Sequence, residues 1–89
     1  MNGLKMTDTR SLSVIARDIR THWVKKDGTP NVNYAAKPYL DAMATLHSVN
    51  DMYGCDTAKS IVLYFLGNAS SFRGEEAKRI KAELKSLIK

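Results

Sequence analysis

The sequence is poor in cysteine and has no long apolar segment, the two features that would indicate a disulfide framework, secretion or a membrane. It contains a single cysteine, Cys55, so an internal disulfide is excluded and the chain suits a reducing compartment. Its longest uninterrupted apolar run, Ile61–Leu66, is far shorter than the roughly 20 residues of a membrane helix. Residues 1–10 lack the apolar segment of a signal peptide. We therefore expect a cytoplasmic protein that does not span a membrane.

The sequence also lacks the patterns that carry common catalytic chemistry. Its five glycines form neither a dinucleotide-binding nor a P-loop motif. His22, His47 and Cys55 do not have the spacing of metal ligands. Cys55 and His47 could form a nucleophilic pair, but such a pair needs an orienting third group, and the sequence indicates none. The favoured interpretation is structural: Cys55 is a small apolar residue near a turn, and His47 is half buried. We expect no enzyme activity, no cofactor and no metal.

What the sequence does contain is the composition of one globular domain with a positive charge. Of its 89 residues, 44% are hydrophobic and 26% are charged, with a formal net charge of +5 and a pI near 9.5. That charge would speed encounters with nucleic acid, anionic lipid or an acidic protein. Solubility alone is an equally good explanation, so the charge does not choose a partner.

Hydrophobic periodicity predicts an all-α fold, a compact bundle of four short helices. Residues 1–10 are expected to form a loose tail and residues 11–89 a single helical domain. The expected helices span residues 11–25, from Pro38 to about Asn50, 57–66 and 75–89. Residues 26–31 collect turn formers, and Pro38 suits the first turn of a helix.

Apolar stripes at helical spacing support the first and last helices. Their members are Leu12, Ile15, Ala16, Ile19 and Trp23 in the first, and Ala77, Ile80, Leu84, Leu87 and Ile88 in the last. The third helix is apolar on nearly every face, so we expect it to be buried. Residues 61–66 also suit a strand, but one strand without a partner leaves its backbone groups unsatisfied, which favours a helix.

A basic stripe on the last helix is the main candidate for nucleic-acid binding. Lys78, Lys81, Lys85 and Lys89 follow i, i+3, i+7, i+11 spacing, and Arg73 precedes the helix. Such a row suits salt-sensitive, sequence-independent contacts with phosphates, but a solvated flank of an amphipathic helix is the favoured interpretation. A helix-turn-helix reader of DNA bases is disfavoured, because the third helix offers few outward polar residues.

Two aromatic residues are candidates for binding a protein partner, Tyr34 and Phe72. Phe72 stands between serines and an arginine, where it is either a staple packed onto the last helix or an exposed anchor. The staple is favoured.

Several segments resemble a group of small uncharacterised proteins of phages, prophages and conjugative elements of gut and other Gram-positive bacteria. These segments are residues 37–43, 48–56, 60–69 and 72–75. The resemblance covers Leu12 to Ile88, but the group more often has a tryptophan at the position of Phe72 and a shorter link after that of Trp23. It implies an accessory protein of a mobile element in a bacterial cell, and no activity is carried over with it.

Small helical proteins of such elements commonly bind something larger, such as the element's DNA, a host regulator or a defence nuclease. We therefore expect a non-enzymatic protein that binds a larger protein of the host or the element. Inhibition of a defence system is one function of this kind. The alternative is nonspecific nucleic-acid binding through the basic stripe. We expect no membrane partner, and no small-molecule substrate is evident.

Overall fold

The computed structural model describes residues 10–88, which form four α-helices and one two-stranded antiparallel sheet. The elements are α2 (Leu12–His22), α3 (Lys37–Met43), β1 (Met52–Tyr53), β2 (Asp56–Thr57), α4 (Ala58–Gly67) and α5 (Glu75–Leu87). The prediction of a mostly helical protein is confirmed. The prediction of a purely helical bundle is wrong, because the protein also contains the two-stranded sheet. The predicted loose tail lies, except for Arg10, outside the described residues, as does Lys89.

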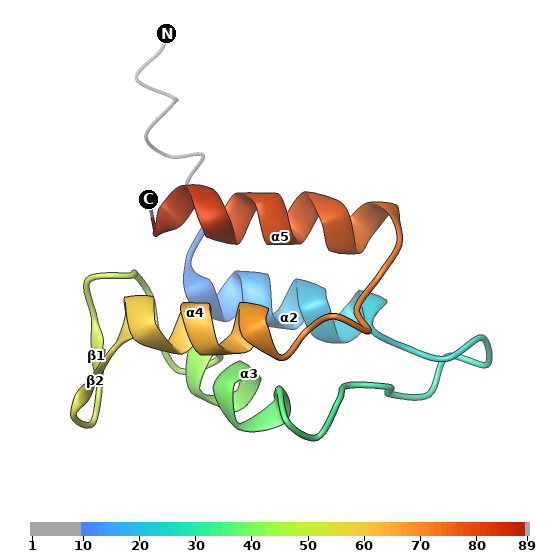
Figure 1. Ribbon diagram of the computed structural model, residues 1–89, viewed down its shortest axis with the longest axis horizontal. Helices are drawn as coiled ribbons and strands as arrows, with labels where there is room; N and C mark the ends of the chain where they lie inside the picture. The colour runs from blue at the N-terminus through green and yellow to red at the C-terminus, as the bar shows by residue number, and fades with distance from the viewer. Residues whose placement is uncertain (1–9, 89) are drawn as a thin grey trace, which may run out of the picture.

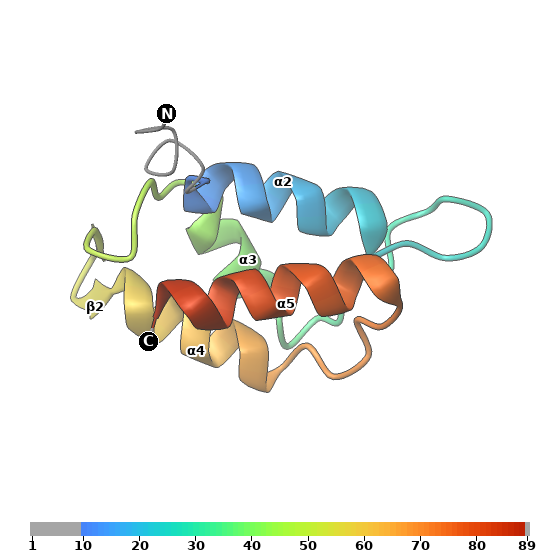
Figure 2. The same cartoon turned by 90° about the horizontal axis from the view of Figure 1, so that it is seen from above.

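The four helices surround one core. In Figure 1, α5 lies above and α3 below, while Figure 2, seen from above, shows α5 beside α2 and crossing in front of α4. α2 packs against α3 and α5, and α3 packs against α4. All five members of the first predicted apolar stripe are buried, and so are Ala77, Ile80 and Leu84 of the last one. None of the helices between residues 10 and 88 meets the length and hydropathy of a membrane-crossing segment.

α2 begins directly after its N-cap residue Ser11 and ends three residues earlier than expected. The Val14 N–H donates to the Ser11 hydroxyl over 3.2 Å, which caps the first turn. Trp23 leaves the helical conformation with φ −92° and ψ 75°. The next residue, Val24, pairs with Pro30 in an antiparallel bridge, and the turn between them replaces the last predicted turn of helix.

α3 ends at Met43, although the apolar pattern predicted a helix to about Asn50. The reason lies in a long-range contact. The carbonyl oxygens of Leu46 and His47 accept hydrogen bonds of 2.9 Å from the Ser13 and Leu12 N–H groups at the start of α2. These N–H groups have no acceptor within their own helix. The segment after α3 leaves the helical conformation, and its carbonyl oxygens serve as the acceptors.

The unexpected sheet is held by Asp51. Its carboxylate accepts the His47 and Ser48 N–H groups at 2.9 and 3.1 Å, and these bonds lower its pKa. Its carbonyl oxygen accepts the Ala58 N–H. The turn between the strands contains Gly54 with φ 63°, a conformation that glycine adopts without strain. Figure 1 shows this hairpin directly before α4.

Residues 61–66 are helical, as predicted, within α4. The Thr57 hydroxyl caps the helix by accepting the Ser60 N–H over 3.1 Å. The strand alternative for residues 61–66 is therefore excluded.

Candidate functional site

The start of α5 is fixed by a glycine. Gly74 is the N-cap residue and has φ 109° and ψ 178°, a region that is essentially restricted to glycine. At 100° per residue, the helix that follows places Lys78, Lys81 and Lys85 on one flank of the apolar stripe. Glu76, Arg79 and Glu83 fall on the other flank.

The flank with Glu76, Arg79 and Glu83 meets α2 in a network of ion pairs. Arg10 bonds Glu83 (Nη2 to Oε1, 2.6 Å) and Asp18 (Nη1 to Oδ2, 3.0 Å). Arg79 bonds Asp18 at 3.1 Å and Glu76 at 2.5 Å. Burial alone would raise the pKa of Asp18, but hydrogen bonds from Arg79 and Arg10 outweigh it and lower that pKa. The acidic side chains of this flank are therefore already neutralised by arginines.

The lysine flank has no such partners. Among residues 10–88, neither Arg73, Lys78, Lys81 nor Lys85 forms an ion pair with a carboxylate. Arg73, Lys78 and Lys85 are exposed. The helix thus separates its charges into a neutralised flank and a flank of uncompensated positive charge, which we call the basic flank: Arg73, Lys78, Lys81 and Lys85. The predicted fifth member, Lys89, lies outside the described residues.

Lys81 differs from its neighbours because it is partly buried and bound. Its Nζ donates to the Phe72 carbonyl oxygen over 2.6 Å and lies 5.8 Å from the centroid of the Phe72 ring. Burial lowers its pKa, and the positive charges of Lys85 and Arg73 lower it further. Lys81 therefore helps to fix the connection before α5, and its charge is less available to a ligand than those of Lys78 and Lys85.

Phe72 is not an exposed anchor, which corrects its place among the candidate protein-binding residues. Only 2% of its surface is exposed. Its ring stacks on Trp23, with centroids 5.0 Å apart and planes 22° apart, and Trp23 also meets Phe65 edge-on. The burial of Phe72 agrees with the staple interpretation. Its aromatic partner, however, is Trp23 at the end of α2, while α5 contributes Lys81.

Tyr34 is 87% exposed, in the turn before α3. The Ala35 N–H donates to the Asn33 side chain over 2.9 Å, which holds that turn. Tyr34 keeps its place as a candidate protein-binding residue.

α4 is not buried on every face, contrary to expectation, and it exposes two large side chains. Leu63 and Tyr64 are each 51% exposed, whereas Ala58, Ile61, Val62 and Phe65 are buried. The Tyr64 ring contacts that of Tyr39 on α3, with centroids 5.4 Å apart. We call Tyr39, Leu63 and Tyr64 the α4 apolar surface. A signal was present in the sequence, since a chain this small lacks the material to cover both sides of an apolar helix.

The hairpin beside α4 extends the exposed apolar area. Met52 and Tyr53 of β1 are 56% and 46% exposed, and β2 runs directly into the first turn of α4. Neither residue was a candidate from the sequence, because its exposure depends on which neighbours the fold supplies.

The two histidines and the cysteine lie at exposed positions. Cys55 is exposed in the hairpin turn, and His47 is exposed in the segment between α3 and β1. The prediction that His47 is half buried is therefore wrong. His22 lies 3.2 Å from the Asp18 carboxylate. Within residues 10–88, no three potential metal ligands gather into one group.

Comparison with protein-family models, with curated proteins and with solved structures gives no match to this chain.

Proposed function

We propose that this chain is a binding protein without catalytic activity of its own, and that it contacts a larger protein partner through the α4 apolar surface. The supporting observation is that Leu63 and Tyr64 are each 51% exposed on a helix whose opposite face is buried. Large apolar side chains gathered at one place on a small domain are typical of interaction sites. Aromatic residues such as Tyr39 and Tyr64 add area at low cost in side-chain entropy and are enriched in interfaces.

Positive charge on α4 and elsewhere on the domain indicates the chemistry of the partner. Lys59 is exposed one turn before Leu63 on the same helix, and the basic flank of α5 adds further positive charge to the domain. A partner patch with an apolar centre and acidic residues around it would complement both features. The exposed β1 residues precede α4 in the chain and would lie towards the rim of such an interface, whereas Tyr34 is a separate exposed candidate.

The biological setting belongs to the same proposal. The resemblance to proteins of phages and conjugative elements supports an accessory role in a bacterial cytoplasm. A host regulator or a defence nuclease is the class of partner that this setting offers.

Affinity purification with one charge-introducing variant tests the proposal. Leu63→Glu should keep its stability within about 0.5 kcal/mol, because the side chain is half exposed. It should lose the captured partner, because a carboxylate would be placed in an apolar interface. Ser86→Glu introduces the same charge at an exposed position of α5 and should retain the partner. Equal capture by both variants would contradict the proposed surface.

Nonspecific nucleic-acid binding is the second candidate, and one observation favours it. Two of the three carboxylates of α5, those of Glu76 and Glu83, are engaged with Arg79 and Arg10. The basic flank is therefore available to phosphates, with Lys78 and Lys85 as its most exposed members on the helix.

Binding of a labelled random-sequence DNA duplex and single strand at about 50 and 200 mM salt tests this candidate. Lys78→Gln with Lys85→Gln should make the log-log salt dependence shallower by about 1.8, or about 0.9 for each lost phosphate contact. Lys25→Gln with Lys26→Gln removes the same net charge from the turn after α2 and should leave the slope unchanged. The same slope change in both double variants would assign the effect to net charge and remove the basic flank from the candidate.

A further inference from the structure

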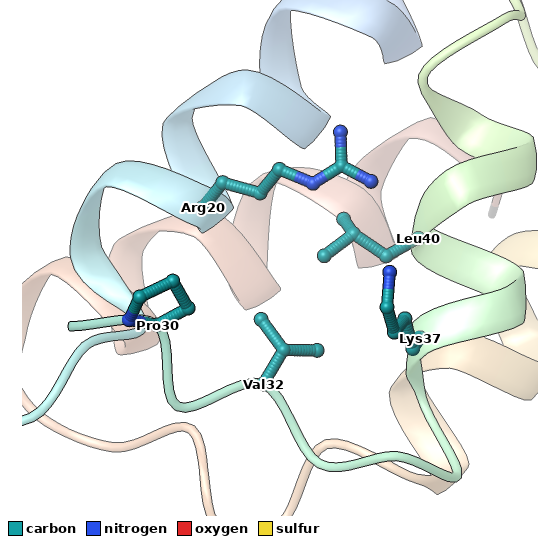
Figure 3. A pocket seen from close by; sticks show the side chains of 5 residues that line it. All are labelled: Arg20, Pro30, Val32, Lys37 and Leu40. Carbon is teal, nitrogen blue, oxygen red and sulfur yellow. The ribbon is translucent and has the colours of Figure 1, made fainter.

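A hollow of about 310 Å³ lies between α2, the segment after the turn at residues 24–30, and α3. It is lined by Arg20, Pro30, Val32, Lys37 and Leu40. Figure 3 shows the Val32 and Leu40 side chains directed into the space beside Pro30, with the Arg20 guanidinium over Leu40 and the Lys37 ammonium at the edge. Its volume is at the lower end of the range for small-ligand sites, and an apolar lining with a few polar groups is typical of them.

The walls of this hollow are fixed by backbone hydrogen bonds. The Asn31 N–H donates to the Trp23 carbonyl oxygen over 3.0 Å, which ties the segment with Pro30 and Val32 to the end of α2. The Lys37 N–H donates to the Asn33 carbonyl oxygen over 3.1 Å and positions the start of α3. A ligand would therefore meet a preformed site and would not have to order it.

The charges at its edge are not balanced. Arg20 and Lys37 share one carboxylate, that of Asp41 on α3. The Arg20 bond to Asp41 uses Nη2, and Nε and Nη1 donate to no residue between 10 and 88. The Lys37 Nζ is 3.4 Å from Asp41 Oδ2, and both side chains are about half exposed or more, which makes this a weak pair. The edge carries one positive charge in excess, with donor groups left over.

We propose that this hollow binds a small organic anion, a carboxylate carried by a short apolar body. The apolar body lies against Val32, Leu40 and the Pro30 ring, and the carboxylate faces Arg20 and Lys37. A single negative charge matches the excess at the edge, and the planar guanidinium suits a carboxylate in particular. The site lies between α2 and α3, and the inference does not rest on the proposed protein-binding surface.

Titration of the ¹⁵N-labelled protein with sodium benzoate at constant ionic strength tests the proposal by NMR. The amide signals of Val32, Lys37 and Leu40 should shift and saturate with a dissociation constant of about 1 mM, as expected for a ligand of this size. Benzyl alcohol has nearly the same shape without the charge, and it should bind about fivefold more weakly, which corresponds to one exposed ion pair. Equal affinity for the two ligands would overturn the proposal.

Two variants assign the effect to the edge of the hollow. Lys37→Gln should fold, because its side chain is 63% exposed, and it should weaken benzoate binding about fivefold while leaving benzyl alcohol binding unchanged. Lys26→Gln removes a charge outside the hollow and should change neither affinity. Benzoate-induced shifts confined to the basic flank of α5, an absence of saturable shifts, or an unchanged affinity in Lys37→Gln would each overturn the proposal.

Discussion

Replacing Phe72 by alanine is expected to lower the free energy of unfolding by about 3–4 kcal/mol. The ring is 2% exposed, stacks on Trp23 and supports the Lys81 ammonium, so its removal leaves a cavity at the junction of α2 and α5. A small domain has about 5–15 kcal/mol of stability in total, and this loss would be a large part of it. Urea unfolding followed by far-UV circular dichroism measures the change.

Trp23 and Tyr34 provide an internal reporter and a control for this prediction. Trp23 is the chain's single tryptophan, so its fluorescence emission should shift to the red in Phe72→Ala as the indole becomes exposed. Tyr34→Ala removes an aromatic side chain that is 87% exposed, and it should change the free energy of unfolding by no more than about 0.5 kcal/mol. A loss below about 1 kcal/mol in Phe72→Ala would contradict the stacked arrangement and restore Phe72 as a surface residue.

Two glycines should respond in opposite directions to substitution by alanine. Gly74→Ala should lower the free energy of unfolding by about 2 kcal/mol, because φ 109° with ψ 178° is strained for any residue with a Cβ atom. Gly67→Ala should raise it by about 0.5–1 kcal/mol, because Gly67 is helical and its φ is not positive.

Space does not explain this difference, since an added Cβ would meet no atom within 4 Å at either position. The comparison therefore isolates the backbone conformation that sets the start of α5 and the placement of its basic flank. Thermal and urea unfolding of the two variants measure the effects. Equal changes in the two variants would show that the start of α5 does not depend on the conformation of Gly74.

The helices were predictable from the sequence where one local pattern decides them. The stripe from Leu12 to Trp23 fixes the buried face of α2, and the charge order from Glu75 to Lys85 agrees with the direction of α5. The end of α3 was not predictable in this way, because the acceptors at Leu46 and His47 serve the first turn of a helix far away in the sequence.

The candidate site was less predictable than the helices. The lysine row on α5 can be read from spacing, but the sequence also shows glutamates on the same helix. Only the fold shows that Glu76 and Glu83 pair with Arg79 and Arg10. Phe72 was ambiguous because its stacking partner, Trp23, is far away in the sequence, just after the end of α2. The hollow between α2 and α3 is invisible in the sequence, since its walls come from three separate segments.

A photoreactive cross-linking residue placed at position 63 tests whether the α4 apolar surface binds a protein. The same residue at position 86 of α5 is the control, and both variants are exposed to a lysate of a Gram-positive bacterium and irradiated. We expect one cross-linked protein of discrete size from position 63, none from position 86, and loss of that product when Tyr64→Lys is added. The same products from both positions, or products that survive Tyr64→Lys, would contradict this expectation.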